Sequence, residues 1–337
     1  LVARVIAAGL ELAVVQKLAG QSAVVDALRG ADRVIFRRDG LLRIVRDSRA
    51  VVLKQRTDGE KGDVIQRAVQ NGLLNGFEDG TVRPDAYITR AEMAAIMVRA
   101  LGADTGADLS SFGDIDKTDW YYDYMSKAVA MGAFKGDGKY LAPYNNISRQ
   151  EACLVLARVF DMPEANMNIL SEYTDDSQIS IWARNELSRV VDGGYIERGG
   201  MLRPLVPMTR VEFAQIIDKI VPQYIAAAGE YTEKDITAKN VMIKVSGVKL
   251  QGLKGTKNVF IADGVKGDTE IADSEIDRVL IRGGKCIFKS GVYKSARAIG
   301  DNSFADLTSF GEGSFGEVYG KPGKGTVIIP ISEVEVK

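Results

Sequence analysis

The sequence predicts a multidomain α + β protein, in which an all-α module of three helix–loop–helix repeats precedes an all-β domain. Two observations support this prediction. A five-residue motif recurs three times between positions 58 and 225, at intervals of 59 and 61 residues. After position 230 the pattern changes to short alternating strands that recur about every 18 to 20 residues. Fixed periods of this kind are typical of repeat architectures.

Positions 1–57 form an N-terminal segment with its own pattern. Charged residues interrupt every apolar run in the first 30 positions, so we expect a helix there that does not span a bilayer. Two alternating stretches, 33–36 and 42–45, flank Asp39-Gly40 and predict a β-hairpin. Because the chain begins with Leu1 and shows no signal peptide, we expect a mature or trimmed polypeptide.

The motif predicts the start of a helix in each repeat. Its copies occupy 88–92, 147–151 and 208–212, and each has a proline five positions before its Thr or Ser. Thr-x-x-Glu ahead of an apolar helical run is a capping box, in which the hydroxyl accepts the N3 amide and the glutamate accepts the N-cap amide.

A second helix is expected ahead of each motif. Apolar residues spaced three and four apart lie on one helix face, and glycines follow them at Gly72, Gly132 and Gly194. Glycine adopts the left-handed conformation of a helix C-terminus without strain. Each repeat is therefore a helix, a loop with glycine and proline, and a second helix, over about 58–105, 106–166 and 167–225. Three such units can share one core.

An arginine follows each capping residue, at Arg90, Arg149 and Arg210. A cation at the first helical position opposes the helix dipole, so its presence in three copies indicates a use. An arginine beside free helix-start amides would bind a carboxylate or phosphate. The alternative is a surface or loop-bracing role.

The only two tryptophans, Trp120 and Trp182, occupy equivalent positions in the second and third repeats. An aromatic-x-Asp sequence lies upstream of each and ends at Asp114 or Asp175. The rings could pack in the core between repeats. They could also stack on a sugar beside the arginine of the preceding repeat, and one ring can do both.

Residues 58–225 resemble the S-layer homology (SLH) repeat family, which fastens bacterial surface proteins to cell-wall polysaccharide. The resemblance implies a pseudo-threefold prism around a central bundle. It also implies grooves between repeats that bind a secondary polysaccharide, often with a pyruvyl ketal whose carboxylate meets the arginine. The polysaccharide-binding residues expected on this basis are Arg90, Trp120, Arg149, Trp182, Arg210, Asp114, Asp175, Gly76 and Gly136.

Two departures from the family pattern set an order among the three grooves. Glu60 stands where the other repeats have Trp, and Arg198 stands where they have glycine. We therefore expect the groove of Arg210 and the first repeat to bind least. The grooves with Arg90 and Trp120, and with Arg149 and Trp182, are the expected sites.

The pattern of the C-terminal domain, 230–337, predicts a short right-handed parallel β-helix of four coils, with a β-sandwich as the alternative. Strands are expected at 240–243, 258–261, 278–281 and 297–299, each followed by a second strand in the first three coils. This part resembles the small β-helical segment that follows SLH repeats in some secreted proteins.

Composition excludes several kinds of chemistry. The chain has no histidine, which removes histidine triads and histidine metal ligands, and its net charge of −1 does not favour nucleic-acid binding. Cys153 and Cys286 fall in apolar patterns and are expected to be buried rather than disulfide-bonded. We expect no catalytic residues, no cofactor and no metal.

The sequence thus predicts a secreted, non-enzymatic protein of the cell wall or S-layer that binds cell-wall polysaccharide non-covalently. Lateral self-association in a surface lattice stays open, and neither a nucleic-acid partner nor a membrane span is expected. The alternative is a wall-anchored polysaccharide-degrading enzyme with a β-helical domain. Four short coils without a clustered acid pair offer little for that chemistry.

Overall fold

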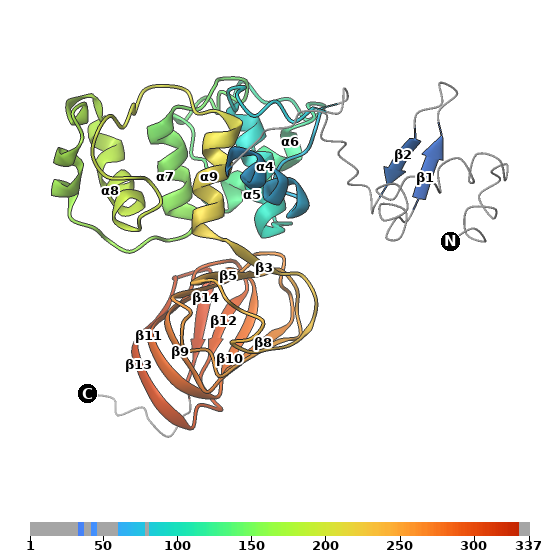
Figure 1. Ribbon diagram of the computed structural model, residues 1–337, viewed down its shortest axis with the longest axis vertical. Helices are drawn as coiled ribbons and strands as arrows, with labels where there is room; N and C mark the ends of the chain where they lie inside the picture. The colour runs from blue at the N-terminus through green and yellow to red at the C-terminus, as the bar shows by residue number, and fades with distance from the viewer. Residues whose placement is uncertain (1–32, 37–41, 46–59, 78–80, 330–337) are drawn as a thin grey trace. The chain divides into compact units, whose positions relative to one another are not determined.

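The computed structural model (Figure 1) describes residues 33–36, 42–45, 60–77 and 81–329. The chain divides into two compact units, one of 1–56 with 75–82 and one of 57–74 with 83–337. In the first unit, β1 (Arg33–Phe36) and β2 (Leu42–Val45) pair antiparallel, as the sequence predicts. The helix expected in the first 30 residues and the hairpin turn lie outside the described residues.

The second unit opens with three repeats, each contributing two α-helices among the described residues. Three short 3₁₀ helices lie in the third repeat: η1 (Met167–Glu172), η2 (Asp176–Gln178) and η3 (Ile181–Ala183). The α-helices are α4 (Glu60–Gln70), α5 (Arg90–Leu101), α6 (Tyr122–Ala130), α7 (Arg149–Val159), α8 (Arg184–Asp192) and α9 (Arg210–Ile220).

The helices that begin at the motifs form the centre of the module (Figure 1). Most residues of α5, α7 and α9 are buried, as is typical of a helix surrounded by others. Each central helix packs against the first helix of the following repeat, α5 with α6 and α7 with α8. Because α9 packs against α4 of the first repeat, the arrangement closes into a ring.

Three backbone hydrogen bonds join the repeats at their pseudo-threefold axis. Ile147 N donates to Ile88 O at 3.0 Å, Met208 N to Ile147 O at 2.9 Å, and Ile88 N to Met208 O at 3.0 Å. All three residues are buried. The closed ring confirms the pseudo-threefold module within one chain.

The C-terminal domain is a parallel β-solenoid, which confirms the predicted β-helix and shows that the β-sandwich alternative is wrong. Every strand pair described in its two sheets is parallel. The handedness stays a prediction. One sheet contains β3 (Gln223–Ile225), β5 (Asn240–Ile243), β7 (Asn258–Ile261), β9 (Ser274–Ile281), β11 (Ser290–Ala298) and β13 (Glu312–Gly320). The other contains β4 (Gly229–Tyr231), β6 (Val248–Gln251), β8 (Asp268–Ala272), β10 (Gly284–Phe288), β12 (Ser303–Asp306) and β14 (Gly325–Ile328).

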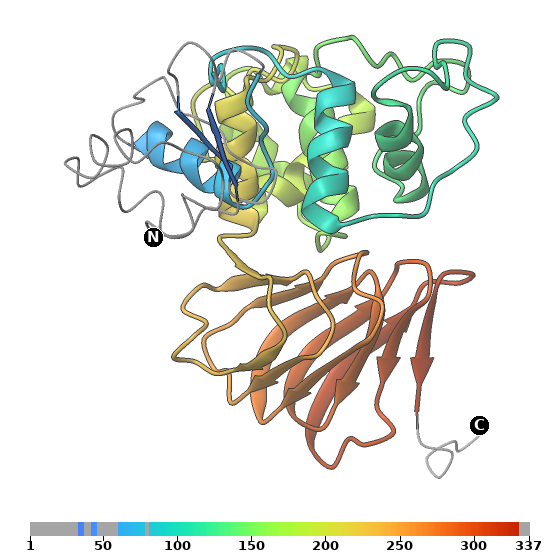
Figure 2. The same ribbon diagram turned by 90° about the vertical axis from the view of Figure 1, so that its right-hand side faces the viewer.

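The solenoid is longer than the sequence indicates. Each sheet has six strands among the described residues, whereas four coils are expected from the pattern. The chain passes from α9 directly into β3, and the strands then follow in chain order from yellow to red (Figure 2). The solenoid therefore starts before position 230.

Identical or similar apolar residues stack along the solenoid interior. Val241, Val259, Val279 and Ala296 follow one another in register on β5, β7, β9 and β11, and all are fully buried. Burying a side chain of this size contributes about 1.5–3 kcal/mol. Such stacks explain why the strands recur at a regular period.

The solenoid caps the C-terminal ends of all three central helices. Gly264 N donates to Leu101 O of α5 at 2.9 Å, and the Asn240 side chain donates to Ile220 O of α9 at 2.9 Å. Arg278 donates to Phe160 O, the residue after α7, at 3.0 Å. The last carbonyls of a helix have no partner within it, so these contacts fix the helical module to the solenoid.

Two further observations complete the fold. Cys153 and Cys286 are buried and free, as the sequence predicts. Within the part of the chain that the structure describes, no helix is long and apolar enough to cross a membrane.

Candidate functional site

The three capping boxes are present as predicted. In the first, Thr89 Oγ1 accepts from Glu92 N at 3.2 Å, and Glu92 Oε2 accepts from Thr89 N at 2.8 Å. The same reciprocal bonds join Ser148 with Glu151 and Thr209 with Glu212. These bonds account for the Thr-x-x-Glu spacing without any ligand.

Each motif arginine binds the motif glutamate of the following repeat. Arg90 Nη1 lies 2.8 Å from Glu151 Oε1, and Arg210 Nη1 lies 3.2 Å from Glu92 Oε1. Arg149 binds Glu212 in the same way. Each glutamate therefore caps its own helix with Oε2 and holds the preceding repeat with Oε1. The facing carboxylate offsets the unfavourable position of the arginine in its own helix dipole.

The expectation of an anion site made from free helix-start amides is wrong. Loop carbonyls of the next repeat in the ring accept the first two amides of each central helix. In α5, Arg90 N donates to Asn145 O at 3.0 Å and Ala91 N to Pro143 O at 2.9 Å. The equivalent acceptors are Val206 O and Pro204 O for α7, and Ala86 O and Pro84 O for α9. Sequence alone does not show which loop reaches these amides.

The three arginines differ in how much donor capacity remains. Arg210 is 4% exposed, and burial lowers the pKa of its guanidinium although Glu92 opposes the shift. Arg90 Nε donates to Leu141 O at 2.8 Å, and its guanidinium lies 5.1 Å from the centre of the Phe134 ring. Arg149 Nε is buried and has no hydrogen-bond partner among the described residues.

Arg149 lines a cavity of about 430 Å³, which we call the Arg149 cavity. Its walls come from α4, α9 and the loop 195–203 of the third repeat, with Tyr173 and Tyr195 among them. Burial raises the pKa of Tyr173 to about 12, so its hydroxyl stays protonated and donates to Glu197 O at 2.7 Å. Trp182 is not among the residues that line this cavity.

Glu212 is the acid closest to the Arg149 guanidinium. Burial disfavours its charged form, but the hydrogen bond from the Thr209 amide and the charge of Arg149 outweigh burial and lower its pKa. Arg203 lies 3.8 Å from the same carboxylate. Two cations therefore flank one anion on this side of the cavity.

The tryptophan rings do not belong to the core, since Trp120 is 57% exposed and Trp182 is 54% exposed. Trp120 packs edge-on against Tyr121, with ring centres 5.6 Å apart, and Tyr121 in turn contacts the exposed Tyr144. Among the described aromatic contacts, none joins Trp120 to Arg90. Among the described residues, no cation–π contact joins either predicted pair, Arg90 with Trp120 or Arg149 with Trp182.

The two predicted aspartates brace loops. Asp114 accepts from Leu141 N at 3.0 Å and Ala142 N at 2.6 Å. Asp175 accepts from the equivalent amides of Leu202 and Arg203, both at 2.8 Å. Both carboxylates thus already accept hydrogen bonds from backbone amides.

The predicted glycines lie in loops. Gly136 has φ 64°, and a Cβ there would lie 2.5 Å from Tyr140 O, so the turn itself requires glycine. Gly76 is half-buried in a loop. In the third repeat, where Arg198 replaces this glycine, Gly199 and Gly200 adopt positive φ instead.

The fold and these contacts define a class of protein: a single-chain ring of three helix-pair repeats joined to a parallel β-solenoid. Residues 56–94 and 111–153 match the family model of the S-layer homology domain. These two segments of the chain therefore carry S-layer homology domains. The third repeat lies outside the matched segments, but it has the same capping box and the same arginine–glutamate pairing.

Curated relatives include surface proteins and enzymes. The surface-layer 125 kDa protein of Lysinibacillus sphaericus is 30% identical over 62% of this chain and 17% of its own length. The S-layer protein sap of Bacillus anthracis is 26% identical over 55% of this chain and 23% of its own length. Exoglucanase XynX of Acetivibrio thermocellus is 30% identical over 50% of this chain and 16% of its own length.

The chain spans less than a quarter of each of these three relatives. The SLH repeats and the surface-layer relatives indicate a location at the cell surface or cell wall.

Proposed function

We propose that this chain anchors a surface protein non-covalently to bacterial cell-wall polysaccharide, with the Arg149 cavity as its principal site. SLH repeats imply attachment of this kind, and the surface-layer relatives agree with a non-enzymatic role. The observation that carries the choice of site is the buried, unpartnered Nε–H of Arg149. The equivalent group of Arg90 donates to Leu141 O.

A buried donor without a partner costs about 1–3 kcal/mol, which a ligand acceptor that reached this group would recover. A carboxylate on a sugar, such as a pyruvyl ketal, fits because arginine binds carboxylates in a planar, charge-assisted manner. Arg149 and Arg203 together exceed the charge of Glu212 by one. The ligand carboxylate supplies the missing negative charge, and Tyr195 offers a surface for the sugar ring.

In this proposal the other predicted residues contribute to ligand binding to different extents. Trp120 and Trp182 are exposed stacking surfaces for sugars further along the chain, since aromatic faces suit the apolar side of a sugar ring. The groove at Arg90 binds more weakly, because its Nε already has an acceptor. The groove at Arg210 binds least, because that arginine is buried.

Two wider roles follow from the relatives. Lateral self-association of surface-anchored copies into a lattice is part of the proposal and is testable by electron microscopy of the purified chain. The second candidate is a wall-binding module of an enzyme, favoured by the match to part of an exoglucanase and part of an amylopullulanase. Incubation with glucans, with detection of new reducing ends, separates these two roles.

Sedimentation with purified cell walls, before and after removal of their secondary polysaccharide, tests the proposal. The parent protein should sediment with intact walls and remain in solution with stripped ones. Arg149→Lys keeps the charge but loses the Nε–H, so it should bind about tenfold more weakly. Arg297→Lys, which makes the same exchange at a solenoid arginine outside the Arg149 cavity, is the matched control. Equal binding to stripped walls, or full binding by Arg149→Lys, would contradict the proposal.

A further inference from the structure

A second cavity lies where the helical module meets the solenoid, and we call it the lysine cavity. Its volume is about 610 Å³. One wall consists of the C-terminal ends of α7, α8 and α9, and the other consists of the starts of β5 and β7 and the middle of β9. Both domains are therefore needed to form it.

The charges lining the lysine cavity are strongly unbalanced, with five cations and one acid. The acid, Asp192, is bound by Arg198, which lies outside the cavity. Two of the cations are engaged: Arg278 by Phe160 O, and Arg189 by Met162 O at 3.1 Å. The other three are Lys219, Lys239 and Lys257. Among the described residues, no hydrogen bond or ion pair reaches their ammonium groups.

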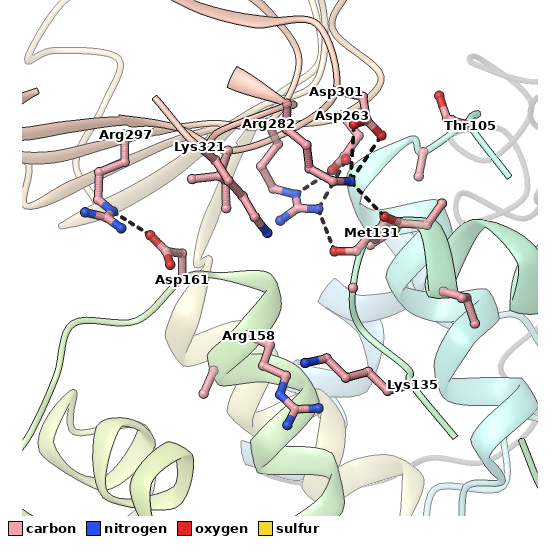
Figure 3. Close-up of a pocket in the computed structure, with 18 of the residues that line it drawn as sticks. Thr105, Met131, Lys135, Arg158, Asp161, Asp263, Arg282, Arg297, Asp301 and Lys321 are labelled. Carbon is pink, nitrogen blue, oxygen red and sulfur yellow. Dashed lines mark hydrogen bonds and ion pairs between the residues drawn. The ribbon is translucent and has the colours of Figure 1, made fainter. Parts of the chain in front are cut away.

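In a neighbouring cavity of about 470 Å³, cationic side chains of this kind have a structural role (Figure 3). It too lies between helix ends and the solenoid, but its eight cations face five acids. Arg297 binds Asp161 at 2.7 Å and Arg282 binds Asp263 at 2.7 Å, as the dashed lines in Figure 3 show. Arg282 also donates to Val159 O of α7 at 2.9 Å, so both arginines join the helical module to the solenoid. Among the described residues, the three lysines of the lysine cavity make no such contact through their ammonium groups.

Two of these lysines occupy the same position on successive rungs of the solenoid. Lys239 and Lys257 precede Asn240 and Asn258, which pair in register, and Lys257 N donates to Lys239 O at 2.6 Å. Neighbouring parallel strands lie about 4.8 Å apart, and like charges directly opposite on adjacent strands destabilise a sheet. Asp277, on the next rung, is bound by Lys294 at 2.7 Å. A cleft with charges of one sign concentrates the field and attracts an opposite charge.

The lysine cavity adjoins the Arg149 cavity. Tyr195 and Lys219 line both. Tyr195 is half-buried, so part of its ring stays open to a ligand. A linear molecule that extends from Arg149 over Tyr195 would therefore run toward the lysines.

We propose that the lysine cavity binds a second acidic group of a carboxylate- or phosphate-bearing saccharide, and that the solenoid supplies half of this site. An acidic chain seated at Arg149 continues over Tyr195 and places its next anion among Lys219, Lys239 and Lys257. This inference rests on the proposed polysaccharide function and adds to it a ligand longer than one repeating unit. It also gives the solenoid a part in binding.

Titration calorimetry with wall-polysaccharide fragments of one and of several repeating units tests this inference. The variant is Lys239→Gln/Lys257→Gln, and the control Lys234→Gln/Lys249→Gln changes the charge equally at exposed solenoid lysines outside the cavity. The variant should bind the short fragment as the parent does and the long fragment about tenfold more weakly, with a smaller salt dependence. The control should match the parent for both fragments, and thermal melting should show that both variants fold.

The outcomes separate this inference from the proposed function. A parent protein that binds neither fragment would overturn both proposals. Equal binding of the long fragment by the parent and by Lys239→Gln/Lys257→Gln would overturn this one alone. Chemical reduction of the carboxylates and phosphatase treatment of the long fragment identify the acidic group, because one treatment should abolish the difference between parent and variant. A difference that survives both treatments would also contradict the proposed anion site.

Discussion

Arg278 Nη1 and Nη2 both donate to the main-chain carbonyl of Phe160, each at 3.0 Å. Arg278 belongs to β9 of the solenoid and is 7% exposed, and Phe160 is the C-cap residue of α7. Burial lowers the pKa of this guanidinium, although the Asp161 carboxylate at 3.2 Å favours its charged form. A cation at a helix C-terminus also interacts favourably with the helix dipole. The solenoid thus completes a helix of the SLH module.

Arg278→Met should therefore destabilise the SLH module, not only the solenoid. Loss of charged hydrogen bonds of this kind costs about 1.5–3 kcal/mol. The chain's only tryptophans, Trp120 and Trp182, lie in the SLH module, so their fluorescence during urea unfolding reports that module. Lys294→Met, which removes an exposed ion pair with Asp277, is the control. An unchanged fluorescence midpoint in Arg278→Met would mean that the two domains are not energetically coupled.

Acid should weaken the contact between the second and third repeats through Glu212. The pKa of Glu212 lies below its ordinary value of 4.5 in the folded protein. Glu212 in the unfolded chain then binds a proton more readily than Glu212 in the folded protein. Its stabilising effect is therefore fully present above its ordinary pKa and is lost as pH falls through the lowered pKa of the folded protein. Glu212→Gln should consequently show a smaller loss of unfolding free energy on acidification. The exposed Glu230→Gln should behave as the parent does, and an equally steep loss in Glu212→Gln would exclude this role.

The capping hydroxyls should contribute to stability and not to binding. Thr209→Ala removes the acceptor of the Glu212 amide and should cost about 1 kcal/mol of unfolding free energy. Thr209→Ser keeps the hydroxyl and should restore most of that loss. Chemical unfolding measures both, and wall sedimentation at a temperature where both variants are folded should show parent-like binding. Weaker wall binding by folded Thr209→Ala would indicate that the cap also shapes the site.

Local sequence rules predicted the helix starts and most strands, while contacts between distant residues were not predictable. The capping boxes and the strands at 240–243 and 258–261 follow from short-range spacing, and both are where the sequence places them. The Arg90–Glu151 pair joins residues 61 positions apart, so spacing within one repeat does not reveal it. The lysine cavity escaped prediction for the same reason, because Lys219 and Lys239 belong to different domains.

Gly313 should be essential for the last rungs of the solenoid. It pairs in register with Gly291 on the neighbouring strand, and a Cβ at Gly313 would lie 1.7 Å from Gly291 O. No real contact is that short, and φ is 132°, which side chains rarely adopt. Gly313→Ala should therefore loosen β13 and expose the C-terminal rungs to limited proteolysis. A parent-like cleavage rate would contradict this packing, and Gly255→Ala, where a Cβ meets no neighbour, is the control.

Alanine substitutions of the three motif arginines should rank differently in their effect on stability and in their effect on ligand binding. Arg210 is the most buried, with 5% of its side chain exposed against 15% for Arg90 and 12% for Arg149, and its loss leaves Glu92 without this partner. Breaking a buried pair in this way costs about 3–5 kcal/mol, so Arg210→Ala should be the least stable of the three alanine variants. Its folded fraction should nevertheless bind wall polysaccharide best, because a buried guanidinium has little surface for a ligand. Calorimetry with a pyruvylated wall fragment, below the melting temperature of every variant, should rank the loss of affinity as Arg149 first, Arg90 second and Arg210 last. A dominant loss in folded Arg210→Ala, or three equivalent sites in the parent, would show that the groove between the third and first repeats binds after all.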